Sequence, residues 1–461
     1  MNALMTYTDH MNDSGFQYDS VVVGLGKTGR SVIDYLLKQK QSIAVVDSRL
    51  QPPELDVIKK KYPRLPVFLG GLDEKILCSG RQLVLSPGIS PMHESIQGAL
   101  AAGAKLSSDI EIFCQQVKAP VIAITGSNGK SSVATLLSLM IQVSGKRAHL
   151  AGNIGLPALD VLEQGNVDFF VLELSSFQLD TVSSLKPVAA VVLNVSPDHM
   201  DRYASYDDYV NSKKNIYRNS EAVIVNLDDA RVVAMGDDNT RLVRYGTAEP
   251  EMDNFGLRTV DGDTYLAYGE ELLMKVASML TPGQHNVSNA LAALALGSSI
   301  SLSMDSMLSA LREFSGLPHR CQQIAMTGGV SWYNDSKGTN VGASCAAIES
   351  LSLRGPVVLI AGGDGKNADF SPLARTIKKH VKTTILIGKD ASLIDKTMDL
   401  QSQRLFASSM QGAVATAHKI ARTGDSVLLS PACASQDMYK DYQHRGDEFT
   451  NCVLALQEQQ S

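Results

Sequence analysis

Short runs of Val, Ile, Leu and Ala recur along the chain and alternate with stretches whose apolar positions repeat every three or four residues. The short runs predict buried β-strands, and the periodic stretches predict amphipathic helices that cover them. This alternation predicts the α/β class, in which ligands bind at the carboxyl ends of the strands. The predicted strands are residues 20–24, 43–47, 82–85, 121–124, 169–174, 189–194, 222–226, 330–334, 356–361, 383–387 and 426–429.

The alternation falls into three blocks, and 461 residues is enough for roughly two to four domains. We predict a Rossmann-like N-terminal domain over residues 1–108 and a central P-loop-type mononucleotide-binding domain over 109–316. A Rossmann-like C-terminal domain is predicted over 317–461. Residues 1–18 are predicted to be a polar leader, because they lack the apolar core of a secretion signal.

Composition narrows the class of protein. The chain is 44% hydrophobic and 20% charged, and its 42 basic and 48 acidic residues give a net charge of −6. This balance argues against general binding to nucleic acid or to a membrane surface. The six cysteines are scattered without a C-x-x-C pair, and no apolar run is long enough to span a membrane. We therefore expect a cytoplasmic protein with free thiols.

The most informative stretch joins a predicted strand to a predicted helix through a glycine-rich loop. Val121-Ile-Ala-Ile is followed by Thr125-Gly-Ser-Asn-Gly129, and Lys130-Ser-Ser132 opens an amphipathic run. In such an arrangement the loop and helix N–H groups face a phosphate, the lysine neutralises its oxygens, and Ser131 can hold Mg²⁺. The usual G-x-x-x-x-G-K-[ST] spacing requires glycine where this chain has Ile124, so the loop is shorter than a standard P-loop. An ordinary strand–turn–helix with a surface lysine is the structural alternative.

A second glycine-rich loop follows the first predicted strand. Gly24-Leu-Gly-Lys-Thr-Gly29 has the G-x-G-x-x-G spacing, and Asp47 ends the next strand. Together they predict a phosphorylated ligand and, taken alone, suggest NAD. Ser86-Pro-Gly88 ends a third strand, where it is either a ligand-binding loop or a tight turn.

Polar groups that suit a metal ion follow two strands of the central region. Glu173 ends a buried strand downstream of the phosphate loop, where an NTP-dependent enzyme places a metal-binding carboxylate. A strand-end glutamate that faces solvent is the alternative. Asp198-His-Met-Asp201 follows the next strand and offers metal ligands and acid–base groups. In Gly152-Asn-Ile-Gly155, the amide of Asn153 is available to a ligand.

The helix predicted over residues 205–217 places a lysine on its apolar face. Lys213 falls at the centre of this face and Lys214 near its edge. Burial disfavours a charged lysine, and a neutral amine can react with CO₂ to form an anionic carbamate that binds metal. A lysine whose stem follows the apolar surface to reach water is the alternative. The apolar residues of this face are Tyr206, Tyr209, Val210, Ile216 and Tyr217.

Further polar residues gather toward the C-terminus. Asn286 and Asn289 lie one turn apart at a predicted helix start, where they either cap the helix or contact a nucleotide base. Gly316-Leu-Pro-His-Arg320 is typical of a domain junction. Each predicted strand of the last region then ends in a polar loop. These loops are residues 335–339, 362–366, 388–390 and 430–435.

Four motifs occur in a fixed order along the chain. They are Thr125-Gly-Ser-Asn-Gly-Lys-Ser131, Asp198-His-Met-Asp-Arg202, His285-Asn-Val-Ser-Asn289 and Leu317-Pro-His-Arg320. Together they resemble the Mur ligase family, the ATP-dependent amino-acid ligases of bacterial peptidoglycan synthesis, whose phosphate loop has this shortened form. Six more motifs resemble the branch of that family that joins D-glutamate to UDP-N-acetylmuramoyl-L-alanine. They lie at residues 24–29, 86–89, 152–155, 172–178, 334–340 and 430–435.

The resemblance implies that the first domain binds the UDP moiety, the second ATP and Mg²⁺, and the third the incoming amino acid. It implies catalytic roles for Lys130, His199 and Lys213, with one Mg²⁺ on Ser131 and a second on Glu173, His199 and the carbamate of Lys213. The implied ATP contacts are Gly126, Ser127, Asn128, Gly129, Lys130, Ser131, Ser132, Asn286, Asn289, Arg320 and Asp335. The implied contacts to the UDP substrate are Gly24, Leu25, Gly26, Lys27, Thr28, Asp47, Ser48, Ser86, Gly88 and Asn153, with Asp47 and Ser48 at the uracil end.

The resemblance also implies the reaction. The alanine carboxylate of the UDP substrate attacks the γ-phosphate of ATP to give an acyl phosphate, and the amine of D-glutamate then displaces phosphate. Two anions meet in the first step, so two metal ions, Lys130 and the loop amides are expected to offset their repulsion. His199 is a candidate base for the amine, and a monomer is expected. The implied D-glutamate contacts are Lys337, Thr339, Lys366, Ser435 and, as a packing ring, Tyr442.

Three other functions compete with this interpretation. A Mur ligase for L-alanine, a diamino acid or a dipeptide, or a folylpolyglutamate synthetase, has the same kind of ATP site. The cations and hydroxyls of the third domain favour a compact dicarboxylate instead. An NAD-dependent oxidoreductase explains the first glycine motif and leaves the phosphate loop and the third domain unexplained. A non-enzymatic nucleotide-binding module leaves the metal ligands unexplained.

Overall fold

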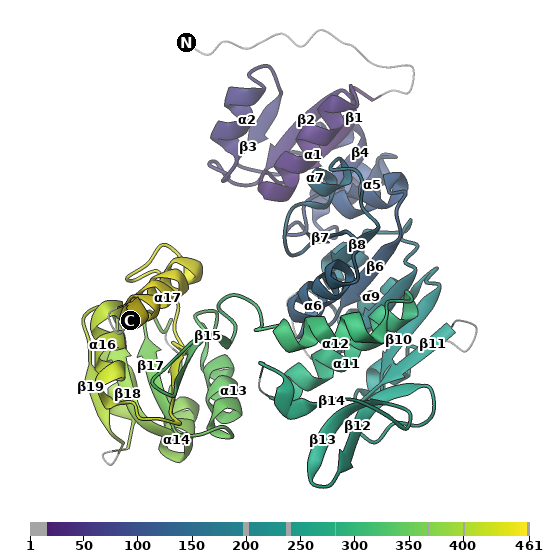
Figure 1. Cartoon of the computed structure of the whole chain (residues 1–461). Helices are drawn as coiled ribbons and strands as arrows, with labels where there is room; N and C mark the ends of the chain where they lie inside the picture. The colour runs from purple at the N-terminus through teal and green to yellow at the C-terminus, as the bar shows by residue number, and fades with distance from the viewer. Residues whose placement is uncertain are drawn as a thin grey trace. The chain divides into compact units, whose positions relative to one another are not determined.

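The computed structural model describes residues 16–196, 202–236, 241–281, 283–366, 368–399 and 402–458. The chain divides into two compact units (Figure 1). The first unit comprises Met1–Arg258, Leu266–Leu273 and Asn289–Leu308. The second comprises Thr259–Tyr265, Met274–Ser288 and Ser309–Ser461.

The first sheet has five strands in the order β3-β2-β1-β4-β5, and neighbouring strands in it run parallel. This order puts the ends of β1 and β4 side by side, which brings together the loops that follow them. The strands are β1 (Tyr18–Val23), β2 (Ile43–Asp47), β3 (Val67–Leu69), β4 (Gly80–Leu85) and β5 (Lys105–Ser108). The helices of this part are α1 (Lys27–Lys38), α2 (Leu55–Lys61), α3 (Glu74–Cys78), α4 (Glu94–Ala101) and α5 (Asp109–Gln116).

The second sheet has nine strands in the order β14-β13-β12-β11-β10-β9-β6-β8-β7. Strand β6 lies between β8 and β9, so the loops after these three strands meet at one edge. The strands are β6 (Val121–Thr125), β7 (Ala148–Gly152), β8 (Phe169–Glu173), β9 (Ala189–Val192), β10 (Ala222–Asn226), β11 (Arg241–Tyr245), β12 (Asn254–Val260), β13 (Asp263–Tyr268) and β14 (Glu271–Lys275). The helical segments are α6 (Lys130–Val143), α7 (Ala158–Leu162), α8 (Ser176–Leu179), α9 (Tyr206–Lys214), η1 (Asn215–Tyr217), α10 (Ala230–Val233), η2 (Val276–Ser278), α11 (Gln284–Ser299) and α12 (Met304–Glu313).

The third sheet lies in the second unit and has six strands in the order β15-β16-β20-β17-β18-β19. Strand β15 is antiparallel to β16, and the other neighbouring strands run parallel. The strands are β15 (Gln322–Thr327), β16 (Val330–Asn334), β17 (Val357–Gly362), β18 (Val381–Ile387), β19 (Arg404–Phe406) and β20 (Ser426–Leu429). The helices are α13 (Val341–Ser352), α14 (Ser371–His380), α15 (Ala391–Thr397), α16 (Met410–Ile420) and α17 (Tyr442–Glu458).

Every predicted strand is present, with ends that differ by a few residues. The sequence did not predict several short strands at sheet edges, such as β3, β15 and β19. Their side chains are only partly buried, so they lack the continuous apolar run of a strand that is covered on both faces. The helix predicted over 205–217 is present as α9 followed by η1.

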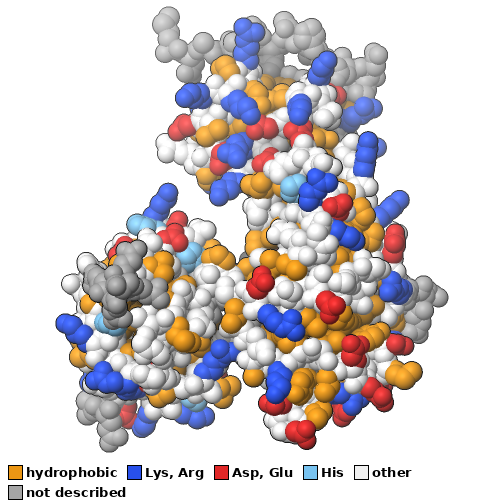
Figure 2. All heavy atoms as spheres, viewed as in Figure 1, with side chains coloured by type: hydrophobic (Ala, Val, Ile, Leu, Met, Phe, Trp, Pro, Cys, Tyr) orange, Lys and Arg blue, Asp and Glu red, His pale blue; other side chains and the backbone are white. Residues whose placement is uncertain are grey.

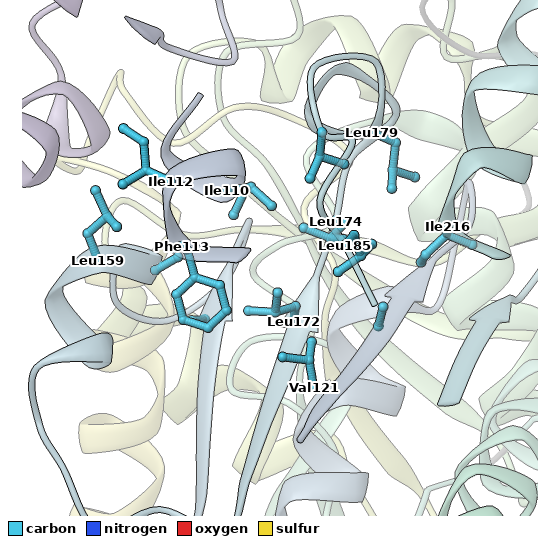
Figure 3. Packing of buried hydrophobic residues seen from close by; sticks show 14 of the residues in the cluster. Ile110, Ile112, Phe113, Val121, Leu159, Leu172, Leu174, Leu179, Leu185 and Ile216 are labelled. Atoms are coloured by element: carbon cyan, nitrogen blue, oxygen red, sulfur yellow. The ribbon is translucent and has the colours of Figure 1, made fainter. Parts of the chain in front are cut away.

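One hydrophobic core joins the first two sheets. It contains Val22 of β1, Phe113 of α5, Leu159 of α7 and Leu172 of β8 (Figure 3). The rings of Phe113 and Phe170 meet edge to face, with centroids 5.1 Å apart. Helices α5 and α7 therefore pack in the same core as the strands that carry the site loops.

The surface carries mixed charge. On the face that Figure 2 shows, basic and acidic side chains are interspersed over both units. Among the described residues, no helix has both the length and the apolar character needed to cross a membrane. All six cysteines are free thiols.

A buried carboxylate ties α5 to the segment that follows α8. Glu111 accepts hydrogen bonds from the backbone N–H groups of Ser183 and Ser184, at 2.7 and 3.0 Å, and from both hydroxyls, at 3.2 and 2.6 Å. Burial acts to raise the pKa of Glu111, but these bonds outweigh it and hold the pKa below its usual value. The charged form of Glu111 is therefore stabilised by folding.

We predict that Glu111→Ala lowers the free energy of unfolding of the first unit by about 3 kcal/mol, because it leaves buried N–H groups without an acceptor. The measurement is urea or thermal denaturation. Gln115→Ala is the control, since it removes a single bond to Glu111 and leaves the serine bonds intact. The difference between wild type and Glu111→Ala should shrink as the pH falls through the lowered pKa, because protonation removes the same contribution. Equal stability of the two proteins at neutral pH contradicts the prediction.

Candidate active site

The phosphate loop between β6 and α6 is held in shape by a strand-end asparagine. Asn194 accepts from the N–H of Asn128 at 2.8 Å, and its amide donates to the Asn128 carbonyl at 3.1 Å. The N–H of Ser127 donates to the Asn194 carbonyl at 2.9 Å. Gly129 begins α6 in the left-handed region (φ +85), and no side chain caps the helix. A helix start without a side-chain cap suits an anion.

Two lysines converge on one carbonyl of this loop. Lys130 Nζ donates to the Gly126 oxygen at 2.8 Å and to the Ser127 oxygen at 3.0 Å. Lys213 Nζ donates to the same Gly126 oxygen at 3.0 Å. Lys213 is 2% exposed and lies 4.6 Å from the centroid of the Tyr209 ring, whereas Lys214 is exposed. The lysine thus lies on the buried face, as the helical pattern predicts.

Only one of the two carboxylate oxygens of Glu173 accepts a hydrogen bond from the described residues. Its Oε1 accepts from the Asn153 side chain at 3.0 Å. Its Oε2 is buried and has no hydrogen-bond partner among the described residues. A buried carboxylate oxygen in this state suits a cation. Glu173 therefore fits the predicted Mg²⁺ site.

A cavity of about 280 Å³ brings Lys130, Lys213 and Asn153 together with the loop that follows β4. Within the described residues no three His, Cys, Asp or Glu side chains form a metal site. Of the predicted metal ligands only Glu173 is a described residue of these types, because His199 lies outside the described residues. The residues that line the cavity are Pro87, Gly88, Lys130, Asn153, Ser175, Ser176, Phe177, Tyr209 and Lys213.

The predicted UDP-binding residues gather at the ends of β1, β2 and β4. Ser86 Oγ donates to the Gly24 carbonyl at 3.1 Å, and a Cβ at Gly24 would lie 2.7 Å from that hydroxyl oxygen. The N–H of Leu25 donates to Asp47 at 2.6 Å. Helix α1 starts at Gly26 without a side-chain cap, which suits a diphosphate. Lys27 and Ser48 are exposed, and Gly26 and Thr28 are half-buried, beside this helix start.

The Asp47 carboxylate accepts hydrogen bonds from other residues of the protein. Its side chain is 1% exposed and also accepts two hydrogen bonds from the Arg49 guanidinium, at 2.9 and 2.7 Å. Burial acts to raise the pKa of Asp47, but the bonds from Arg49 and from the N–H of Leu25 outweigh it and lower the pKa. Asp47 thereby joins the first glycine loop to the end of β2.

Asn289 lies against the phosphate loop in the first unit. Three other residues that were predicted to contact ATP belong to the second unit. A Cβ at Gly129 would come within 2.4 Å of Asn289 Oδ1, so the loop and α11 fit together only with glycine there. Asn286, one turn earlier on α11, belongs to the second unit together with Arg320 and Asp335. Ser131 and Ser132 are half-buried in the first turn of α6.

Asp335 is buried beside Arg320 in the second unit. Its Oδ2 accepts from Ser430 Oγ at 2.6 Å, and its Oδ1 accepts from the N–H of Cys321 at 3.1 Å. Burial raises the pKa of Asp335 to about 7, although these hydrogen bonds and the charge of Arg320 act to lower it. Burial, and then the charge of Arg320, also hold the pKa of Lys337 below its usual value.

The predicted D-glutamate residues lie on loops that follow neighbouring strands of the third sheet. Backbone bonds join the loops: Ala432 N–H donates to the Gly338 carbonyl at 2.9 Å, and Ala434 and Asp364 exchange two bonds. Ser435 is buried, Lys366 is exposed and Thr339 is half-buried. Lys337 Nζ lies 4.0 Å from the centroid of the Tyr442 ring, a cation–π contact that fits Tyr442 as a packing ring.

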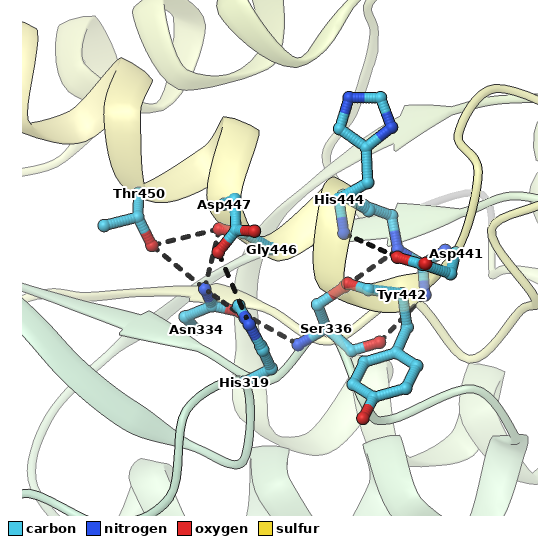
Figure 4. A network of polar contacts seen from close by, with 10 residues as sticks. His319, Asn334, Ser336, Asp441, Tyr442, His444, Gly446, Asp447 and Thr450 are labelled. Atoms are coloured by element: carbon cyan, nitrogen blue, oxygen red, sulfur yellow. Dashed lines mark hydrogen bonds and ion pairs between the residues drawn. The ribbon is translucent and has the colours of Figure 1, made fainter. Parts of the chain in front are cut away.

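A polar network fixes the β16 loop to α17 (Figure 4). The buried amide of Asn334 donates to the Gly446 carbonyl at 2.8 Å and to Thr450 at 3.1 Å, and lies 3.2 Å from His319 Nδ1. Ser336 Oγ donates to the Tyr442 carbonyl at 2.7 Å. The network holds the loop of Lys337 next to Tyr442.

Several residues that shape the site were not predicted from the sequence. Asn194 ends a predicted strand beside the phosphate loop, and that position was the available signal. Arg445 is 1% exposed and donates to the carbonyls of Ser336 and Cys433. These two residues lie in the loops that follow β16 and β20. No local pattern marks it, because its partners lie far away in the sequence.

Known proteins resemble the chain over nearly its whole length. Family models match in three parts: the Mur ligase MurD-like N-terminal domain at residues 18–108, the Mur ligase middle domain at 124–297, and the Mur ligase glutamate ligase domain at 319–433. A UDP-N-acetylmuramoylalanine–D-glutamate ligase of Marinobacter nauticus is 49% identical over 95% of this chain and 98% of its own length. The chain belongs to the Mur ligase family. The enzyme of the same name from Pseudomonas aeruginosa is 45% identical over the same shares.

Solved Mur ligases share the fold at lower identity. The UDP-N-acetylmuramate–alanine ligase of Thermotoga maritima has a TM-score of 0.58 at 17% identity and covers 95% of this chain and all of its own. A UDP-N-acetylmuramoyl-L-alanyl-D-glutamate–2,6-diaminopimelate ligase has a TM-score of 0.60 at 16% identity, over 82% of this chain and 92% of its own. These likenesses confirm the predicted three-domain α/β fold. The boundaries at 108 and 316 stay a prediction.

Family membership decides several of the alternatives. The chain is an ATP-dependent, ADP-forming amide ligase, as Mur ligases are, so its nucleotide is ATP. The NAD-dependent oxidoreductase and the non-enzymatic module are set aside. The roles of the individual site residues stay predictions.

We predict that Asp335→Asn stabilises the protein at high pH. In the native state Asp335 keeps its proton up to a pKa of about 7, whereas the unfolded carboxyl loses it near 3.8. Stability therefore falls as the pH rises between these values, by up to about 4 kcal/mol at about 1.4 kcal/mol per pKa unit. Asparagine keeps the shape, an acceptor for Cys321 and a donor for Ser430, without the charge.

The measurement is thermal denaturation between pH 4 and pH 8. Asp335→Asn should match wild type near pH 4 and melt at a higher temperature at pH 8. Glu349→Gln, on the exposed face of α13, is the control and should follow wild type throughout. A constant difference between Asp335→Asn and wild type at all pH values contradicts the assignment.

Proposed function

We propose that this chain joins D-glutamate to UDP-N-acetylmuramoyl-L-alanine, with ATP converted to ADP and phosphate. The observation that carries the proposal is the identity of 44–49% over 95% of the chain with ligases of that name. The geometry supports the same reaction, since Lys130 of the phosphate loop and Lys213 line one cavity together with Asn153, which contacts the buried carboxylate of Glu173.

The first step brings two anions together. Lys130 and the uncapped N-terminus of α6 would neutralise the γ-phosphate. The first sheet would hold the UDP moiety on the N-terminus of α1 and on the Ser86–Gly88 turn. The alanine carboxylate would then point into the cavity that Asn153 and Lys213 line. Its attack on the γ-phosphorus forms an acyl phosphate and releases ADP.

Magnesium fits this site because Glu173 has a buried oxygen without a partner among the described residues. Ser131 would hold one ion, and Glu173, His199 and a carbamate on Lys213 would hold a second. Bound Mg²⁺ would neutralise the phosphate oxygens and the attacking carboxylate. Burying the Lys213 ammonium beside that of Lys130 is costly, and conversion to a carbamate replaces one positive charge by a negative one.

The second step needs a bound dicarboxylate. Lys337, Lys366, Thr339 and Ser435 would bind the two carboxylates of D-glutamate, and the Tyr442 ring holds Lys337 in place. The free amine attacks the acyl carbon, and the carbon–oxygen bond to the phosphate breaks. We further propose that the enzyme acts in the cytoplasm as a monomer.

An amino-acid panel tests the acceptor. Phosphate release from ATP is measured with UDP-N-acetylmuramoyl-L-alanine and, in turn, D-glutamate, L-glutamate, L-alanine and diaminopimelate. We expect D-glutamate alone to stimulate release strongly. If D-glutamate gives no more phosphate than the others, the proposed acceptor is wrong.

Two neighbouring lysines test the carbamate. Lys213→Ala should lose more than about 99% of the activity, and added formate or acetate should restore part of it by supplying the missing oxygens. Lys214→Ala is the matched control and should retain activity, because Lys214 is exposed one residue away. Full activity of Lys213→Ala would overturn the role assigned to this residue.

A further inference from the structure

The short helix α7 lies between two parts of the site. It packs beside α1 and α5 in the first unit (Figure 1). Helix α1 begins at the loop proposed to bind the UDP moiety. The segment just before α7 carries Asn153, which contacts Glu173. Helix α7 is therefore in contact with the elements that serve both ends of the proposed UDP substrate.

A partly buried hydrogen bond links α1 to α7. Ser31, in the second turn of α1, is 2% exposed, and its hydroxyl donates to Asp160 Oδ1 at 2.5 Å. A hydroxyl bonded to a carboxylate at this distance is a short, charge-assisted hydrogen bond. It joins residues that are 129 positions apart in the sequence.

Polar side chains link α1 to α7 beside the apolar core that the two helices share. A cleft of about 550 Å³ opens beside the bond, with Tyr35, Lys61 and Leu159 among its lining residues. At the end of α1, Lys38 and Glu163 form an ion pair of 2.7 Å, but both side chains are exposed. Exposed pairs contribute little. The Ser31–Asp160 bond is therefore the stronger polar link between the two helices.

The other end of α7 leads to a rigid turn. The N–H of Asn153 donates to the Glu173 carbonyl at 2.8 Å. Gly152 has φ +96, and a Cβ there would lie 2.3 Å from the same carbonyl oxygen. The turn is thus held directly on β8, and its Asn153 lines the active-site cavity.

From these contacts we infer that α7 is a brace that sets the distance between the UDP-binding end of α1 and the reactive cavity, with Ser31 and Asp160 as positioning residues. The inference rests on the proposed function, in which one substrate spans both places. A substrate held at both ends binds well only when the two subsites are correctly spaced, and a misplacement of about 1 Å can cost about 100-fold in rate. UDP alone occupies only one end and does not depend on the spacing.

Equilibrium binding of two probes to the purified full-length protein tests the brace. Calorimetry measures the affinities of UDP and of UDP-N-acetylmuramoyl-L-alanine for wild type, Ser31→Ala and Asp160→Ala. Both variants should bind the whole substrate about tenfold more weakly and bind UDP as wild type does, with an unchanged KM for ATP. Asp160→Ala provides a second, partly exposed position if Ser31→Ala does not fold.

Two controls separate positioning from general damage. Asp160→Asn keeps an oxygen that accepts from Ser31 and should bind the whole substrate nearly as wild type does. Lys38→Ala breaks only the exposed pair and should change neither affinity by more than about twofold. If Ser31→Ala lowered the affinities for UDP and for the whole substrate equally, or lowered neither, the brace would be overturned. Wild type that binds neither ligand would instead overturn the proposed function on which the brace rests.

Discussion

The carbonyl oxygen of Gly126 accepts hydrogen bonds from both Lys130 and Lys213, which places two amines side by side at the phosphate loop. A carboxylate and a triphosphate repel each other, and the repulsion is strongest in a cavity that excludes water. In the proposed reaction Lys130, the uncapped start of α6 and Mg²⁺ held by Glu173 and the Lys213 carbamate would offset it. Asn194 in turn holds the loop that carries Gly126 in place through hydrogen bonds to Ser127 and Asn128.

Much of this arrangement follows from local sequence. Continuous apolar runs identified the central strands, and the rule that ligands bind at strand carboxyl ends located the loops. Helical periodicity alone placed Lys213 on a buried face, and the structure buries it. The edge strands escaped prediction because they are half-exposed and carry no continuous apolar run.

The parts that escaped prediction depend on contacts between distant residues. Asn194 matters because β9 lies next to β6, which the sheet order determines and the sequence does not state. Arg445 matters because helix α17 brings a guanidinium to carbonyls of two loops more than ten residues away along the chain. The same holds for Ser31 and Asp160, each an ordinary polar residue until the two helices meet. His199, by contrast, is prominent in the sequence and lies outside the described residues.

The central claim is that the substrate carboxylate is activated by transfer of the γ-phosphate. Labelling the alanine carboxylate of UDP-N-acetylmuramoyl-L-alanine with ¹⁸O tests it directly. The carboxylate oxygen that bonds to phosphorus leaves with the phosphate when the amine attacks, so mass spectrometry should find one ¹⁸O in each released phosphate. Released phosphate without the label would contradict the account.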